Sequence, residues 1–338
     1  MATANQIVAL LKSHINDDEE QLLSIALQVA AAEARRGRDS KAQELRDLVD
    51  RARKENKSHK RRSRAPTSLA TPRGDLVGLV HASDPKTTLN DMVLSAEVEE
   101  RLQSLLHQQW QRDRLRDHGQ RPSAHLLLVG PPGSGKTMTA AAIAGELKLP
   151  LMTIRLENLI TRFLGETAAK MRLVFDEIAN RRAVYLFDEF DALGASRGRD
   201  NDVGEMRRVL NSFLLFVEEP NSTDSVVIAT TNHPKILDHA LLRRFDDVIE
   251  YELPTTAEVR GIVKDCLGSM GAKIRAWKKI TDTAVGLSHG EITRAALEVV
   301  KLAILDHQES VTANQLVRAL ENRRSMRISM HSNATDQQ

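Results

Sequence analysis

A glycine-rich segment, GPPGSGKT at 130–137, directly follows the apolar run HLLLVG near the middle of the chain. Glycines allow backbone N–H groups to turn inward around phosphates, and the alanine-rich helix expected next adds the positive end of its dipole. In this pattern Lys136 reaches the β- and γ-phosphates of a nucleotide, and the Thr137 hydroxyl ligates Mg²⁺. The segment therefore predicts a site for ATP and Mg²⁺, against the alternative of a glycine-rich turn without a ligand. The nucleotide contacts predicted in this segment are Pro132, Gly133, Ser134, Gly135, Lys136, Thr137 and Met138.

A second segment, YLFDEFD at 185–191, ends a hydrophobic run with two carboxylates. Asp188 would place its carboxylate beside the metal, as a second ligand after Thr137. Glu189 would act on the attacking water as a general base or polarising group, since phosphoryl transfer depends mainly on positioning and charge neutralisation. Asp191 is interpreted as a helix cap without a chemical role. The presence of Glu189 favours hydrolysis over a passive nucleotide switch.

Three further polar residues follow in the order that such a site requires. Asn232 ends the run SVVIATTN, where it could hold the attacking water or the γ-phosphate; a hydrogen bond at the edge of the core is the alternative. Arg243 and Arg244 follow in LDHALLRRFDD. Adjacent arginines are usually surface charge, but their place in the order suggests arginine fingers that enter the site of a neighbouring subunit.

The elements that position these residues can be predicted from hydrophobic runs between 75 and 253. Continuous apolar runs separated by helical patterns are typical of strands buried on both faces of a parallel α/β sheet. After Pro254 the pattern is helical as far as Met326, which predicts a second, smaller domain at 254–326 and a polar, disordered tail at 327–338. The five predicted strands are HLLLVG (125–130), LMTIRL (151–156), AVYLFDE (183–189), SVVIATTN (225–232) and DVIEYEL (247–253).

The chain before this region has two parts of different composition. Residues 1–50 carry three short helical patterns, which predict a small helical domain that docks, oligomerises or holds a partner. Residues 51–74 begin with RARKENKSHKRRSR and continue with Pro, Thr, Ser and Gly, which predicts a basic flexible linker. A solvated tether is the first interpretation of the linker. A nucleic-acid-binding arm is the alternative, although no aromatic residues are interleaved with the basic ones.

Composition excludes several classes of protein. The net charge of +2 favours no particular partner, and the single cysteine, Cys266, rules out an internal disulfide. We find no signal-peptide pattern at the start and no uncharged apolar run near the ~20 residues that span a bilayer. We therefore expect a cytoplasmic protein without membrane association.

Taken together, GPPGSGKT, YLFDEFD and IATTNHPKILDHALLRRFDDVIEYELP resemble the AAA family of ATPases over about 75–325. The resemblance implies a P-loop NTPase fold with a parallel five-stranded sheet at 75–253 and a helical lid at 254–326. It also implies a homohexameric ring in which Arg243 and Arg244 complete the neighbouring site. In the lid, LSHGEITRAALEVVKLAI resembles the region that covers adenine, with Gly290 at a position where the protein-remodelling branch has a small residue.

Within the family, the chain looks most similar to the protein-remodelling group that includes katanin, spastin and the ATPase domain of the AAA proteases. In that group an aromatic–hydrophobic–glycine tripeptide lines a central pore and grips polypeptide. The matching residues here are Phe163, Leu164 and Gly165 of RFLGE. We therefore expect an unfoldase acting on a protein substrate, with a nucleic-acid motor or loader as the alternative. No HExxH motif of a zinc protease occurs in the chain, so any protease or effector would be a separate partner, held through the N-terminal domain.

Overall fold

The computed structural model describes residues 74–159, 164–190, 213, 215–217, 219, 223–233, 242–271 and 274–335. The described residues do not include the predicted N-terminal domain or, apart from Gly74, the predicted linker. Phe163 and Asp191 also lie outside them. Among the described helices, none combines the length and the apolar character needed to cross a membrane.

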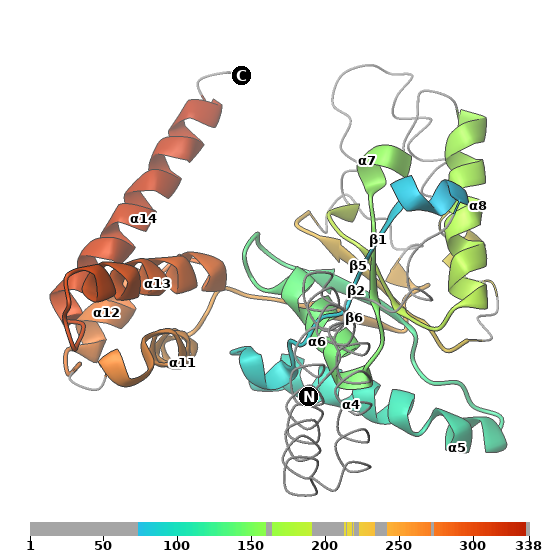
Figure 1. The fold of residues 1–338 in the computed structure, drawn as a ribbon, viewed down its shortest axis with the longest axis horizontal. Coiled ribbons are helices and arrows are strands. Elements are labelled where there is room, and N and C mark those ends of the chain that lie inside the picture. Colours follow the sequence, from blue (N-terminus) through green and yellow to red (C-terminus); the bar gives the residue numbers. More distant parts are fainter. Residues whose placement is uncertain are drawn as a thin grey trace, which may run out of the picture. The chain divides into compact units, whose positions relative to one another are not determined.

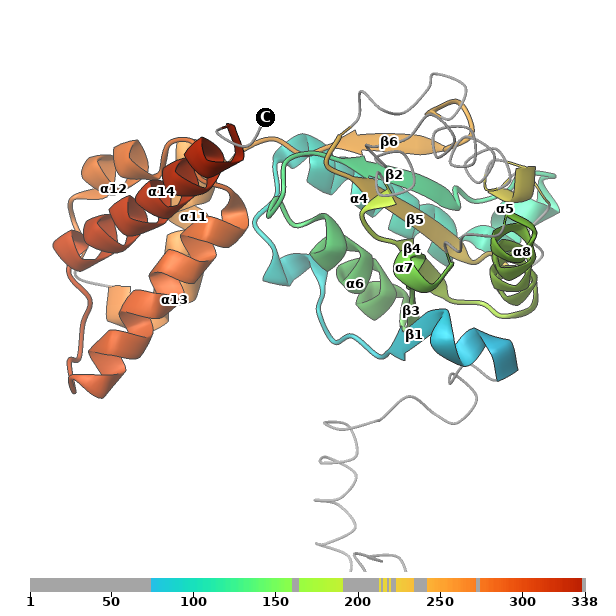
Figure 2. The same ribbon diagram turned by 90° about the horizontal axis from the view of Figure 1, so that it is seen from above.

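The centre of the fold is a six-stranded sheet with the strand order β1-β3-β4-β5-β2-β6, which can be followed in Figure 2. Each of the five strands predicted from the sequence forms, although each is shorter than its apolar run, and the four pairings among them are all parallel. The strands are β2 (His125–Val129), β3 (Leu151–Ile154), β4 (Val184–Phe187), β5 (Val226–Thr231) and β6 (Asp247–Glu250).

The sixth strand, β1, was not predicted and makes the sheet mixed rather than wholly parallel. β1 (Val80–Ser83) pairs antiparallel with β3 at the edge of the sheet, with Val80 opposite Ile154. Its sequence VHAS has no apolar run, and His81 is exposed because the strand covers only an edge. The expected five-stranded sheet is therefore corrected to six strands.

Helices cover both faces of the sheet, and successive strand residues alternate between two cores. Leu126 and Leu128 pack with α4 (Ala96–Trp110) and α6 (Lys136–Leu147). Leu127 and Val129 pack on the other face, with α7 (Leu156–Leu159) and α8 (Leu164–Asn180). This alternation is the period-two geometry of a strand buried on both faces. The short elements of this domain are η1 (Gly74–Gly78), η2 (Leu89–Asp91) and α5 (Arg112–Asp117).

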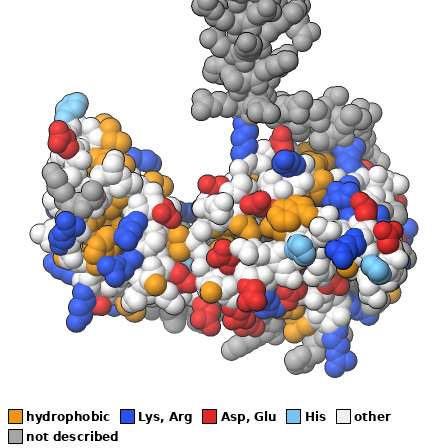
Figure 3. Space-filling view, turned by 90° about the horizontal axis from the view of Figure 1, so that it is seen from below, with side chains coloured by type: hydrophobic (Ala, Val, Ile, Leu, Met, Phe, Trp, Pro, Cys, Tyr) orange, Lys and Arg blue, Asp and Glu red, His pale blue; other side chains and the backbone are white. Residues whose placement is uncertain are grey.

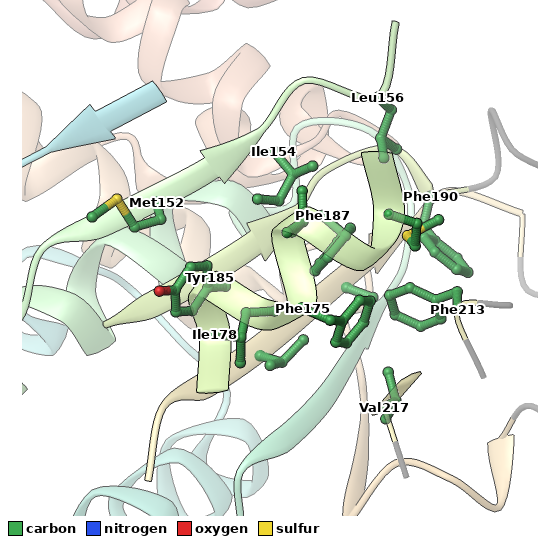
Figure 4. Packing of buried hydrophobic residues seen from close by; sticks show 14 of the residues in the cluster. Met152, Ile154, Leu156, Phe175, Ile178, Tyr185, Phe187, Phe190, Phe213 and Val217 are labelled. Atoms are coloured by element: carbon green, nitrogen blue, oxygen red, sulfur yellow. The ribbon is translucent and has the colours of Figure 1, made fainter. Parts of the chain in front are cut away.

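The core under α8 contains most of the large rings of the chain (Figure 4). Six of the seven phenylalanines in the sequence belong to this cluster or pack against it, and the seventh, Phe163, lies outside the described residues. Phe213 lies in the middle, with ring centroids 5.0 Å from Phe187 and 4.5 Å from Phe190. Phe187 and Phe190 directly flank Asp188 and Glu189, so the two buried rings fix the backbone on both sides of the carboxylates.

A group of helices after Pro254 forms the predicted second domain, which we call the lid (Figure 1). Its helices α11 (Thr256–Leu267), α12 (Trp277–Ala284), α13 (His289–Leu305) and α14 (Ala313–Thr335) share a core of their own; η5 (Gly268–Gly271) follows α11. α14 continues nine residues past Met326, which corrects the predicted boundary between the lid and a disordered tail. The segment RISMHSNAT contains no glycine or proline, so nothing in it ends the helix.

Candidate active site

The phosphate loop lies where β2 ends and α6 begins, with its lysine already inside it. Lys136 is 7% exposed, and its Nζ donates to the carbonyl oxygens of Gly130 at 2.7 Å and Pro131 at 3.0 Å. The same ammonium donates to Asn232 Oδ1 at 2.9 Å. Asn232 follows β5, the neighbour of β2 in the sheet, so sheet order brings the two predicted residues together. The contact brings the Lys136 ammonium and the Asn232 amide together at the carboxyl ends of β2 and β5.

Two glycines give the loop its shape and connect it to the lid. Gly133 has a φ of +78° and Gly135 a φ of +104°, in the left-handed region that side chains with a Cβ rarely adopt. A Cβ on Gly133 would lie 2.7 Å from Ser288 Oγ of the lid, and Gly290 N–H donates to Gly133 O at 2.8 Å. The loop and the start of α13 therefore touch through backbone, and a Cβ on Gly290 would lie 3.3 Å from Gly133 O. Pro132 and Met138 are exposed, whereas Ser134 is buried.

The predicted metal ligands lie next to each other. Thr137 Oγ1 donates to the carboxylate of Asp188, with oxygen–oxygen distances of 3.0 and 3.2 Å. A hydroxyl and a carboxylate side by side, below a loop that binds phosphate, form the oxygen-donor set that suits Mg²⁺.

Asp188 and Glu189 are both held by one residue that the sequence analysis did not select, Thr230. The Thr230 hydroxyl donates to Asp188 Oδ1 at 2.6 Å and accepts from Glu189 N–H at 3.0 Å. Glu189 has a φ of +52°, a conformation that costs energy in any residue other than glycine. Such strain is typical of functional sites, and here it turns the chain sharply after Asp188 while the Glu189 side chain remains exposed. A sequence signal existed: Thr230 lies two residues before Asn232, a spacing that points two side chains to the same side of an extended chain.

Thr230 provides a direct test of this arrangement. We expect Thr230→Val to lower the rate of ATP hydrolysis about tenfold, because neither carboxylate-bearing residue keeps its hydroxyl contact. Loss of the acceptor for the Glu189 N–H should also lower the free energy of unfolding by about 1–3 kcal/mol. Thr230→Ser restores the hydroxyl and should restore hydrolysis. Thr231→Val, in the same buried strand, is the control and should keep the native rate; a native rate in Thr230→Val would show that the contact has no catalytic role.

Burial shifts the pKa values of a tyrosine and a histidine near the site. Tyr251 OH and Thr139 Oγ1 share a hydrogen bond of 2.6 Å, which joins α6 to the chain after β6. Burial raises the pKa of Tyr251 to about 12, so it remains a neutral phenol. Burial lowers the pKa of His289, the first residue of α13, which favours a neutral imidazole beside Gly290.

The structure places Arg243 and Arg244 near the amino-terminal ends of β2 and β6, whereas the phosphate loop of their own chain follows the carboxyl end of β2. They lie in a turn just before β6, and the nearby Asp246 carboxylate accepts from the N–H groups of Ala124 and His125, where β2 begins. The loop follows the other end of β2, about 16 Å away along the five-residue strand. Arg243 is exposed and Arg244 is half-buried. Neither arginine therefore belongs to the phosphate site of its own chain.

The predicted pore tripeptide is described only in part. Phe163 lies outside the described residues, while Leu164 and Gly165 begin α8. The helix then packs against the strand that carries the carboxylates: the Phe175 and Phe187 rings are stacked at 5.9 Å.

Comparison with known proteins shows the family to which the chain belongs. The sequence profile of the ATPase family associated with various cellular activities (AAA) matches residues 126–253. The chain is 32% identical to the protein named uncharacterized AAA family ATPase y4kL of Sinorhizobium fredii, over 95% of this chain and 96% of that protein. It is 34% identical to the proteasome-activating nucleotidase of Thermococcus onnurineus, over 63% of this chain and 56% of the relative.

Two further proteins are similar over a smaller part of this chain than the y4kL protein is. ATP-dependent zinc metalloprotease FtsH 2 of Sphaerobacter thermophilus is 30% identical over 69% of this chain but only 37% of the protease. The crystal structure of the FIGL-1 AAA domain has a TM-score of 0.58 and 22% identity, over 76% of this chain and 91% of that domain. This last similarity shows a shared fold. Because the family profile matches and a relative is 32% identical over nearly the full length, the chain belongs to the AAA family of ATPases and hydrolyses ATP.

Proposed function

We propose that this ATPase is a protein remodeller that assembles as a homohexamer and passes polypeptide through a central pore lined by Phe163, Leu164 and Gly165. The observation that carries the proposal is the packing of α8 on the catalytic strand. α8 begins with Leu164, and its Phe175 ring stacks on Phe187, the residue before Asp188. A helix is stiff, so a displacement at the carboxylates on hydrolysis is transmitted to the start of α8.

In this proposal the chemistry at the site is divided among five side chains. Lys136 neutralises charge on the transferred phosphoryl group, and Asn232 beside it orients the attacking water or the γ-phosphate. Glu189 accepts a proton from that water, because its carboxylate is exposed at the end of β4. Mg²⁺, held by Thr137 and Asp188, would supply charge neutralisation at the phosphates.

The relatives support action on proteins. The names of the two curated relatives from other groups link nucleotide chemistry to the proteasome and to a zinc metalloprotease. This chain spans about a third to a half of their length and contains no HExxH sequence. In our proposal it contributes the ATPase, and a separately encoded protease or effector acts on the polypeptide that it releases.

The position of the arginines supports this assembly. Because Arg243 and Arg244 lie near the strand ends opposite their own phosphate loop, in our proposal they act on the nucleotide of a neighbouring subunit. A closed ring gives every site such a neighbour.

The pore loop can be tested with an unfolded protein as the probe. We expect Phe163→Ala to weaken ATP-dependent binding of fluorescein-labelled casein at least tenfold, because the aromatic grip is removed, while ATP hydrolysis without casein stays within twofold. Phe163→Tyr keeps the ring and should bind casein as the native protein does. Leu215→Ala removes an exposed apolar side chain elsewhere and serves as the control. Native casein binding by Phe163→Ala would rule out threading by this loop.

The alternative function, a nucleic-acid motor, predicts a different result when ATP hydrolysis is measured with nucleic acid. If the protein were a nucleic-acid motor, single- or double-stranded DNA or RNA would raise the hydrolysis rate at low salt, and the stimulation would fall steeply as salt increased. We expect the rate to be unchanged by either nucleic acid.

A further inference from the structure

Two hollows lie side by side on the surface of the lid and share residues of α12. One has a volume of about 610 Å³ and is lined by Lys278, Lys279 and Arg324, among others. The second, of about 380 Å³, is lined by Arg260, Trp277 and again Lys278. Figure 3 shows basic side chains around an apolar patch on the lid. We call this surface the lid groove, formed by Arg260 and Lys264 of α11, Trp277, Lys278, Lys279 and Asp282 of α12, and Glu321 and Arg324 of α14.

Trp277 gives the groove an apolar wall that charged surfaces normally lack. It begins α12 on the same face as Ile280 and Ala284, which are buried in the lid core, and it remains half-buried at the edge of that core. The Arg260 guanidinium lies 5.3 Å and the Lys264 ammonium 5.8 Å from the ring centroid. Both are cation–π distances, so two positive charges are held against the ring.

The other cations of the groove have no acidic partner within the described part of the chain. Lys278, Lys279 and Arg324 are exposed, and no ion pair joins them to any described carboxylate, although Asp282 and Glu321 line the same hollow. The lid groove thus holds five cations and two carboxylates, and Trp277 lines the smaller of its two hollows. A surface of this kind combines an unsatisfied positive charge with a place for an apolar side chain.

We propose that the lid groove binds an acidic peptide segment of a partner protein, with an apolar side chain of that segment against Trp277. The combined hollows are of the size that takes a few residues of extended chain. Spaced carboxylates can pair with the groove cations without displacing Arg260 or Lys264 from the ring.

A nucleic acid fits the same surface less well. A base stacks on a broad area of an aromatic ring, part of which the two cations at Trp277 occupy, whereas one apolar side chain needs a smaller contact. Asp282 and Glu321 would also repel closely spaced phosphates, while in a peptide they can accept hydrogen bonds from backbone N–H groups. The proposal does not depend on threading or on hydrolysis, because the groove residues are separate from both sites.

The experiment uses the full chain and a short fluorescein-labelled peptide of alternating glutamate and leucine. We expect binding measured by fluorescence anisotropy at low salt, weakened at least tenfold in Lys278→Gln/Lys279→Gln/Arg324→Gln. The matched control, Arg294→Gln/Lys301→Gln/Arg318→Gln, removes three exposed lid cations outside the groove and should bind as the native chain does. ATP hydrolysis without peptide should stay within twofold in both variants, which confirms that they fold.

Trp277 supplies a second readout at the groove itself. The chain has two tryptophans, and Trp110 is 55% exposed, so Trp110→Phe leaves Trp277 as the only indole emitter. In this background the unlabelled peptide should shift the emission of Trp277. Equal binding by the groove and control variants, no binding by either, or tighter binding of a single-stranded oligonucleotide than of the peptide would each overturn the proposal.

Discussion

Replacing Glu189 by glutamine is expected to slow ATP hydrolysis by about 100-fold or more, because the amide cannot accept the proton of the attacking water. ATP binding should persist, since Lys136, Thr137 and the loop backbone are unchanged. Glutamine has nearly the same shape as glutamate, and the backbone of residue 189 keeps its N–H contact with Thr230. The measurements are phosphate release and the retention of labelled ATP on the protein.

Glu309→Gln is the control for this change, because Glu309 is an exposed carboxylate of the lid. It should hydrolyse ATP at the native rate. If Glu189→Gln did so as well, the general base would have to be sought elsewhere. Because the variant should hold ATP and its protein substrate together, proteins retained by it from cells would also identify what the ATPase acts on.

The second large effect is expected at the arginines. Arg243→Ala/Arg244→Ala should lower hydrolysis by about 1,000-fold, the magnitude typical of an arginine finger, with ATP binding intact. The loss should be reversed when this variant is mixed with Glu189→Gln. In the mixture, a subunit that keeps Glu189 can receive arginines from a neighbour that lacks the base, so some sites are complete again.

Each single variant, Arg243→Ala and Arg244→Ala, then shows which guanidinium is responsible. Arg318→Ala, which removes an exposed arginine of α14, is the control and should hydrolyse ATP at the native rate. Recovery of activity on mixing requires sites shared between subunits. An inactive mixture of two variants that form rings would contradict action between subunits, and native activity of the double variant would exclude any finger role.

Much of the fold could be read from the sequence because strands buried on both faces have an unmistakable pattern. Runs such as LLLV and VVIATT admit few other structures, and all five predicted strands form. β1 was missed because it covers an edge, where only one side of the strand is enclosed and no apolar run is required. The end of α14 was misplaced for a related reason, since polar residues neither drive a helix nor stop it.

The active-site features also fall into two groups, those that the sequence determines and those that only the tertiary structure brings together. By itself, the sequence determined the phosphate loop, because its conformation depends on glycines and a lysine within eight consecutive residues. It also determined that Asp188 and Glu189 end a buried strand. The conformation of both segments depends mainly on residues that are neighbours in the sequence.

Only the tertiary structure decided which distant residues complete this chemistry. Thr230 reaches Asp188 because β5 lies beside β4, and Gly290 reaches Gly133 because the lid meets the loop. The five cations of the lid groove are spread over three helices and come together only when those helices pack. Strand order and helix packing arise from burial of apolar surface, which is not directional along the chain, so no short pattern of residues records them.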